Sequence, residues 1–141
     1  MRYATIEELE LIFQIFRQYP EWFAHIDRYY LRQEIQKQHV IYDQQCVLIS
    51  RPIQKRYHIG TCEVHNGDWK LGQFAVTQQG NPHNHLFFQQ WLDTHSNSNI
   101  WLTVLPANNR AKRFYTKYGF HQQGMIHWKS ISGEVWVRPI A

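Results

Sequence analysis

The first clear pattern in the chain is a set of hydrophobic residues three or four positions apart. Its members are Leu9, Ile12, Phe13 and Phe16. This spacing gathers them on one face of a helix and predicts a helix that runs to about Gln18. Thr5 and Glu8 have the spacing of a capping box, in which two residues satisfy backbone N–H groups reciprocally, so we expect the helix to start beside them.

A second helical pattern follows the pair Tyr19-Pro20. Proline ends the first helix and suits the first turn of the next one. The second helix is therefore expected from about Glu21 to Gln38. Its hydrophobic positions form a broad stripe that comprises Trp22, Phe23, Ile26, Tyr30 and Ile35.

The segment from residue 40 to residue 76 has the hydrophobic pattern of short β-strands. Strands are predicted over residues 40–42, 46–50, 57–65 and 71–76. The basic segment 51–56 reads as a hairpin loop, and Asn66-Gly67 is the strongest short signal for a hairpin. We therefore expect three consecutive strands to form an antiparallel meander.

Helical spacing returns after a turn-rich link over residues 77–82. Asn81 is expected to cap a third helix, and Pro82 suits its first position. The helix is predicted to run to about His95. Its buried face is expected to contain Leu86, Phe87 and Trp91, with Phe88 as a further candidate.

The stretch from residue 100 onward predicts a strand, a helix and two more strands. Residues 100–105 are almost all hydrophobic, and Pro106 stops this strand because it has no N–H to donate. A helix is expected over about residues 108–118, ended by Gly119 in a left-handed conformation. A strand is expected after Phe120 through Trp128, and we expect Ser132-Gly133 to turn the chain into a last strand over residues 134–138.

Three residues of the helix over 108–118 share one face. Asn108, Ala111 and Tyr115 fall within about 60° of one another on an α-helix, so this face carries an amide, a gap and a phenol. With Gly119-Phe120 behind it, the pattern Asn-x-x-Ala-x-x-x-Tyr resembles the C-terminal half of the acetyl-CoA site in the GNAT family of acyltransferases. An ordinary amphipathic helix between two strands is the alternative interpretation.

The predicted order of elements resembles that of the GNAT family over essentially the whole chain. The resemblance implies the fold class α/β (α+β), a GNAT-like mixed and mostly antiparallel central sheet with helices on both faces. It also implies one acyltransferase domain over residues 1–141. The strand ending at Val76 and the strand starting near Ile100 are expected to be adjacent, parallel and splayed, so that the pantetheine arm of acetyl-CoA pairs with their backbone.

The resemblance also assigns roles to single residues. Ala75 and Val76 are expected to contact the cofactor, with a backbone N–H near Val76 polarising the thioester carbonyl. Asn108 and Ala111 complete this part of the cofactor site. Tyr115 is expected to be the general acid that protonates the departing thiolate.

The expected phosphate site departs from the family pattern. CoA phosphates are expected at the start of the third helix, near Gly80, Asn81, His83 and Asn84, because a helix N-terminus attracts anions. The family has Gln/Arg-x-x-Gly-x-Gly/Ala there, whereas this chain has fewer glycines and a proline without an N–H at position 82. A plain helix cap without a ligand is therefore the alternative. Gly80-Asn81 and the segment 22–26 also resemble some phage-borne GNAT-like proteins.

The sequence does not identify a general base. Glu63 is the strand carboxylate nearest to the expected position, and Gln73 can hydrogen-bond a substrate but cannot accept its proton. His58, His65 and His127 titrate in the right pH range, but each is also typical of a surface histidine.

Composition narrows the class of protein. Aromatic residues make up 16% of the chain, which argues against disorder, and no apolar run is long enough to span a membrane. Cys46 and Cys62 lie in predicted strands and are interpreted as buried thiols in a reducing cytoplasm. The 9 histidines are scattered, the closest pair being His83 and His85, so no metal site is expected.

Charge and resemblance together lead to three hypotheses on function. The net charge of +4 suits an anionic ligand such as CoA. The first hypothesis is an acetyl-CoA-dependent N-acyltransferase that acts on an amine acceptor, which the sequence does not identify. The second is a GNAT-like binding or regulatory module that has lost its CoA site. The third, an acyltransferase that modifies nucleic acid, lacks any base-reading motif. The oligomeric state is open, and a homodimer is compatible with the sequence.

Overall fold

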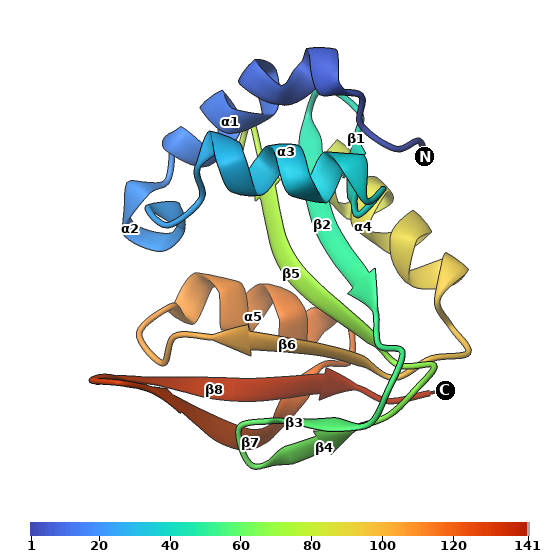
Figure 1. Ribbon diagram of the computed structural model, residues 1–141, viewed down its shortest axis with the longest axis vertical. Helices are drawn as coiled ribbons and strands as arrows, with labels where there is room; N and C mark the ends of the chain where they lie inside the picture. Colours follow the sequence, from blue (N-terminus) through green and yellow to red (C-terminus); the bar gives the residue numbers. More distant parts are fainter. Residues whose placement is uncertain (141) are drawn as a thin grey trace. The chain divides into compact units, whose positions relative to one another are not determined.

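The structure is a computed structural model that describes residues 1–140. The helices, in chain order, are η1 (Ile6–Glu8), α1 (Leu9–Arg17), α2 (Pro20–Phe23), α3 (Arg28–Gln36), α4 (Pro82–Thr94) and α5 (Asn109–Lys117) (Figure 1). The strands are β1 (Val40–Tyr42), β2 (Cys46–Pro52), β3 (Tyr57–Ile59), β4 (Cys62–Val64), β5 (Trp69–Val76), β6 (Ile100–Val104), β7 (His121–Trp128) and β8 (Ile131–Arg138).

The predicted mixed and mostly antiparallel sheet is confirmed. Its six strands are ordered β1-β2-β5-β6-β8-β7. The pairs β1–β2, β6–β8 and β7–β8 are antiparallel, and β5–β6 is parallel as expected. The parallel ladder joins Trp69 to Ile100 and Lys70 to Trp101, near the start of both strands. The splay of their later residues stays a prediction.

The single long helix expected over 21–38 is wrong, because two helices occupy this segment. α2 ends at Phe23, and α3 begins after Asp27. The Asp27 carboxylate accepts a hydrogen bond from the N–H of Tyr30 at 2.8 Å. Asp27 thus caps a new helix, and a capping carboxylate competes with a continuous helix for the backbone.

The expected meander is also wrong, because the segment 57–65 does not enter the large sheet. β3 and β4 form a separate two-stranded sheet, and β2 lies directly beside β5. Gly60 turns the chain between β3 and β4 with a φ of +58°, a conformation that favours glycine. A Cβ at this position would lie 2.0 Å from the Met125 carbonyl oxygen, so the hairpin also needs glycine to pack against β7.

The last turn lies earlier than expected. Lys129, with a φ of +50°, stands in the turn between β7 and β8, and Ser132 and Gly133 are inside β8. A Cβ on Gly133 would lie 2.5 Å from the Trp128 ring, so this glycine makes room for an aromatic neighbour. Gly133 therefore allows close packing and does not form a turn.

The described residues form two compact units, and one domain over 1–141 stays a prediction. The first unit comprises residues 1–50 and 73–94. In this unit, Val47 and Ile49 of β2 join a hydrophobic core with residues of α1 and α3. The alternate residue Cys46 faces the other way and contacts Asn84 of α4. Helices therefore cover both faces of this part of the sheet.

The buried hydrophobic face of α4 differs from the prediction at Leu86 and Leu92. Phe87, Phe88, Trp91 and Leu92 are buried, whereas Leu86 is 64% exposed. Phe87 stacks on Phe74 of β5 with ring centroids 6.0 Å apart. Leu86 thus lies on the solvent side of a helix whose aromatic residues pack on the sheet.

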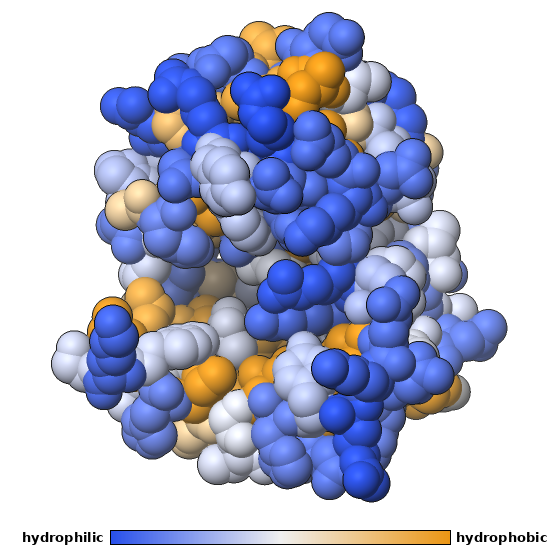
Figure 2. Space-filling model, in the orientation of Figure 1, coloured by the Kyte–Doolittle hydropathy of each residue, from blue (hydrophilic) through white to orange (hydrophobic). Residues whose placement is uncertain are grey.

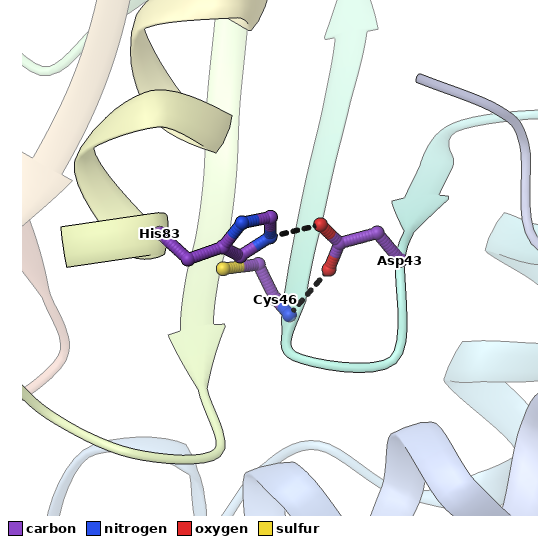
Figure 3. Close-up of side chains that lie close together, drawn as sticks. All are labelled: Asp43, Cys46 and His83. Carbon is purple, nitrogen blue, oxygen red and sulfur yellow. Dashed lines mark hydrogen bonds and ion pairs between the residues drawn. The ribbon is translucent and has the colours of Figure 1, made fainter. Parts of the chain in front are cut away.

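Asp43 closes the turn between β1 and β2. Its Oδ1 accepts a hydrogen bond from the N–H of Cys46 at 2.8 Å (Figure 3) and a second one from the N–H of Gln45 at 3.1 Å. The carbonyl of Gln45 in turn accepts from the N–H of Thr77 at 2.8 Å. The turn is therefore tied to the point where the chain leaves β5.

The second unit comprises residues 51–72 and 95–141. One face of β8 contributes Val135 and Val137 to a core that also contains residues of the β3–β4 hairpin. The alternate residue Trp136 donates from Nε1 to Glu134, which also contacts Lys112 of α5. The two faces of β8 therefore pack against the hairpin and against α5.

The surface is polar over most of the face seen in Figure 2, with hydrophobic residues scattered among hydrophilic ones. Within residues 1–140, every helix is too short or too polar to cross a membrane.

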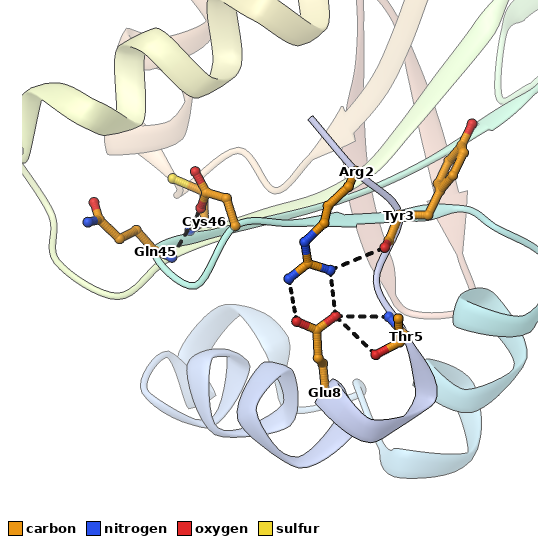
Figure 4. Close-up of polar contacts among 7 residues, drawn as sticks. Arg2, Tyr3, Thr5, Glu8, Gln45 and Cys46 are labelled. Atoms are coloured by element: carbon orange, nitrogen blue, oxygen red, sulfur yellow. Dashed lines mark hydrogen bonds and ion pairs between the residues drawn. The ribbon is translucent and has the colours of Figure 1, made fainter.

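The predicted capping box is confirmed and is extended by an ion pair. The Glu8 carboxylate accepts from the N–H of Thr5 at 2.9 Å, and Arg2 donates to both of its oxygens at 2.8 and 2.5 Å (Figure 4). The hydrogen bonds from Arg2, with a smaller part from Thr5, lower the pKa of Glu8 to about 2. The folded state therefore favours the charged carboxylate.

We predict that Glu8 makes folding sensitive to acid. A carboxyl group with a lowered pKa stabilises the folded state above its unfolded pKa, near 4.5, and this contribution is lost as the pH falls toward 2. Urea unfolding should show that wild type exceeds Glu8→Gln in free energy of unfolding at neutral pH, and that the difference shrinks between pH 4.5 and pH 2. Glu7→Gln, at an exposed neighbour, is the matched control. A difference that does not change with pH would contradict this account.

Candidate functional site

The end of β5 is held by two tyrosines from the N-terminal helical segment. The Tyr19 hydroxyl donates to the carbonyl oxygen of Val76 at 2.6 Å, and the Tyr30 hydroxyl donates to Oε1 of Gln73 at 3.0 Å. Ala75 is 4% exposed, and its side chain belongs to the core of the first unit. Ala75 can therefore contact a cofactor only through its backbone.

Asn81 caps α4 as predicted, and this cap uses two N–H groups that the sequence assigned to phosphate. The Asn81 side chain accepts from the N–H of His83 at 2.9 Å, and its carbonyl accepts from the N–H of Asn84 at 3.0 Å. Gly80 has a φ of +81°, and a Cβ there would meet open space. The most accessible backbone for an anion is thus the loop before the helix.

The Asn84 side chain points inward, away from a phosphate at the helix start. Asn84 is 6% exposed, and its Nδ2 donates to the carbonyl of Gln78 at 2.8 Å. Its Oδ1 accepts from the thiol of Cys46 at 3.3 Å. Asn84 therefore fixes the loop and the start of α4 from within the core.

His83 lies in a cluster that the sequence analysis missed. Its Nε2 hydrogen-bonds Oδ2 of Asp43, and the thiol of Cys46 lies beside the pair (Figure 3). Burial, with a smaller part from the Asp43 charge, raises the pKa of Cys46 to about 12. Histidine spacing could not reveal this cluster, because its other two members are an aspartate and a cysteine in a distant turn.

The expected buried thiols are both confirmed, since Cys46 and Cys62 are buried and free. Cys62 belongs to the core of the second unit.

On α5, Asn108 acts as the helix cap. Its side-chain oxygen accepts from the N–H of Ala111 at 3.2 Å, and α5 ends before Gly119 with a φ of +88°, as predicted. The carbonyl of the Asn108 amide is therefore used within the helix. Its Nδ2 is the part of the side chain with which a ligand could be recognised.

Tyr115 lies among aromatic rings. Its ring centroid is 5.5 Å from those of both Phe114 and Phe120. The residue as a whole is half-buried, but desolvation raises the pKa of its phenol above the ordinary value of 10.0. The phenol therefore keeps its proton at neutral pH, as a general acid must, although a raised pKa also makes proton transfer less favourable.

A carboxylate next to this part of α5 is already engaged. Glu134 is 9% exposed, and its oxygens contact Lys112 Nζ at 3.3 Å and Trp136 Nε1 at 2.9 Å. These contacts join Glu134 of β8 to α5 and stabilise the packing of the helix on the strand.

The candidate bases considered from sequence lie away from central strands or are engaged. Glu63 stands in the separate β3–β4 hairpin, is exposed and lies 3.5 Å from Arg56. His58, His65 and His127 are exposed, as expected of surface histidines.

The structure distributes the predicted cofactor residues over both units. The first unit contains Ala75, Val76 and residues 80–84. Within residues 80–84, the cap of α4 joins Asn81 to His83. Asn108, Ala111 and Tyr115 belong to the second unit and follow one another along α5.

Comparison by sequence finds no relatives. No protein-family model matches the chain, and no curated protein matches it with significance.

Comparison by structure finds many solved proteins of similar fold. A GNAT-family acetyltransferase from Streptococcus agalactiae has a TM-score of 0.78 at 13% identity, covering 98% of this chain and 93% of its own. Naa20 from Chaetomium thermophilum, solved with a bisubstrate analogue, has a TM-score of 0.76 at 13% identity over 99% and 85%. The ribosomal-protein-S18-alanine N-acetyltransferase from Escherichia coli has a TM-score of 0.74 at 12% identity over 99% and 92%.

These matches show that the chain has the GNAT acetyltransferase fold over its full length. The fold class expected from the sequence is thus confirmed. A phage origin finds no support in these comparisons.

We predict that Asn108 has a capping role separable from any ligand contact. Asn108→Ala removes the cap and should lower the free energy of unfolding by about 1 kcal/mol, whereas Asn108→Asp keeps an acceptor for the Ala111 N–H and should stay close to wild type. Chemical denaturation of the three proteins measures this. Equal losses in both variants would show that the side-chain oxygen does not stabilise α5.

Proposed function

We propose that this chain is an acetyl-CoA-dependent N-acyltransferase that moves an acetyl group to the amine of an acceptor. The observation that carries the proposal is the α5 face, where Asn108, Ala111 and the desolvated phenol of Tyr115 follow a buried strand. The fold adds support, because its solved neighbours include N-acetyltransferases and the fold typically uses acetyl-CoA.

The residues of the first unit supply the proposed cofactor contacts at β5 and α4. The backbone of Ala75 and Val76 pairs with the pantetheine arm, as an added strand would. The pyrophosphate binds the loop around Gly80 and Asn81, where a Cβ on Gly80 would meet open space and the α4 dipole favours an anion. His83 and Asn84 act mainly by holding this loop in place, since Asn81 and Gln78 engage them.

The residues of the second unit supply the proposed chemistry. The acceptor nitrogen attacks the thioester carbonyl carbon, a C–N bond forms, and the C–S bond breaks. Tyr115 gives its proton to the departing thiolate, and the proton lost by the amine leaves to water. The phenolate then recovers a proton from solvent. Asn108 and Ala111 line the same helical face and contact the cofactor.

A second candidate function is a binding or regulatory module without catalysis. One observation favours it, namely that the cap of α4 uses the N–H groups of His83 and Asn84. Such a protein would hold CoA weakly or not at all.

Acetyl-CoA binding separates these two functions. At a concentration 100 times Kd, the cofactor should stabilise the folded chain by about 2.7 kcal/mol and raise its Tm. Absence of any shift at millimolar acetyl-CoA would contradict the enzyme proposal and favour the module. Binding without transfer to a broad panel of peptide and small-molecule amines would also favour the module.

The role of Tyr115 is tested by removing its hydroxyl. Tyr115→Phe should bind acetyl-CoA with nearly unchanged affinity, while the single-turnover rate of acetyl transfer falls by roughly 10²-fold, the lower end for a lost general acid. Because the phenol pKa is raised, the wild-type rate should not decline through loss of this acid until the pH exceeds 10.0. Tyr118→Phe, at the end of the same helix, is the control and should react like wild type. A near-normal rate in Tyr115→Phe would remove this residue from the mechanism.

A further inference from the structure

Three side chains with metal-binding atoms converge where the β1–β2 turn meets the start of α4. The carboxylate of Asp43, the thiol of Cys46 and the imidazole of His83 place one donor atom each within 4.8 Å of one another. Figure 3 shows the three residues, with Asp43 and Cys46 on one turn and His83 on the facing helix. All of them belong to the first unit.

The spacing of these donors is close to that of a tetrahedral site. With bonds of about 2.0 Å to nitrogen or oxygen and about 2.3 Å to sulfur, two donors of a zinc ion lie roughly 3.3–3.6 Å apart. The more distant donors therefore need to approach by little more than about 1 Å, whereas the hydrogen-bonded atoms His83 Nε2 and Asp43 Oδ2 need to move apart to admit the ion. Rotation of these half-buried side chains can provide both movements.

Neighbouring hydrogen bonds aim the donors at one another. The N–H groups of Gln45 and Cys46 hold Oδ1 of Asp43, so Oδ2 is the oxygen that faces His83. The carbonyl of Gln78 holds the amide of Asn84, whose Oδ1 lies 3.3 Å from the Cys46 sulfur. Partners of this kind orient metal ligands in proteins.

The same residue types occur in cysteine nucleophile sites, but the geometry argues against that role. Cys46 has an exposed fraction of 0%, and its thiol donates to Asn84. A nucleophile needs access to a substrate and a base that takes its proton, and His83 is turned toward Asp43 instead.

The donor set also selects the class of cation. Magnesium and calcium prefer oxygen ligands, whereas a site with one thiolate, one imidazole and one carboxylate suits zinc and similar thiophilic cations. Asn84 Oδ1 or a water molecule can take the fourth position.

We propose that Asp43, Cys46 and His83 bind one zinc ion, which fastens the β1–β2 turn to the first turn of α4. On binding, the Cys46 thiol loses its proton to solvent and forms an S–Zn bond. The proton on His83 Nε2 moves to Nδ1 through solvent, and the Asp43–His83 hydrogen bond is replaced by bonds from Nε2 and Oδ2 to the ion. The proposal is independent of acetyl transfer, because its donors form a complete three-ligand set without any substrate.

Cobalt is the probe that reports the sulfur bond directly, because it takes zinc sites and absorbs light. The full chain, first stripped with a chelator, should bind one equivalent of Co²⁺ with the near-ultraviolet absorption of a cobalt–thiolate bond, and Zn²⁺ should displace it. Cys46→Ala should abolish the thiolate band, and His83→Ala should weaken binding by more than about 100-fold.

The chain offers a matched control for each variant. Cys62→Ala removes the other buried thiol, and His85→Ala removes the exposed histidine two residues along α4. Both should bind cobalt like wild type. No thiolate band in wild type, or equal binding by Cys46→Ala and Cys62→Ala, would overturn the proposal. If Cys46→Ala does not fold, the comparison of His83→Ala with His85→Ala decides. Neither histidine is buried, so both variants are expected to fold.

Discussion

The hydrogen bonds that hold the exit of β5 determine how the first unit can function. Thr77 donates to the β1–β2 turn directly after the strand, and Tyr19 binds the carbonyl of Val76, the last strand residue. Backbone groups at the end of a strand must find partners, and here they find them in a turn and a tyrosine. The loop before α4 therefore begins at a fixed point, and the Asn81 cap holds its other end at the start of the helix.

This constraint explains why a glycine-poor loop remains a reasonable phosphate site in the proposed function. Asn81 uses both its side chain and its carbonyl to order the first turn of α4, so the N–H groups of His83 and Asn84 are engaged and the backbone before Asn81 is left for an anion. The buried Asn84 supports that segment through Gln78. The second unit contributes a different property, because burial raises the pKa of the Tyr115 phenol above its ordinary value of 10.0.

Much of the fold could be predicted from the sequence because local signals agree with it. Hydrophobic spacing, the Glu8 capping box, the Asn81-Pro82 start and the Gly119 end all act within a few residues. Predictions failed where a residue had a second use, as when Asp27 capped a new helix or Gly133 made room for Trp128. The cluster around His83 was missed because Asp43 lies 40 positions away in the chain, and only packing brings the two together. The acceptor and the base leave no local signal at all.

The central claim of the proposed function is that acetyl-CoA contacts the end of β5 and the loop before α4 in the first unit, and residues of α5 in the second. Hydrogen–deuterium exchange with and without acetyl-CoA tests it most directly, since each backbone amide reports on its own segment. The account predicts slower exchange at residues 75–81 and 108–115, with little change in the β3–β4 hairpin. Protection confined to other segments, at a concentration where the cofactor demonstrably binds, would contradict it.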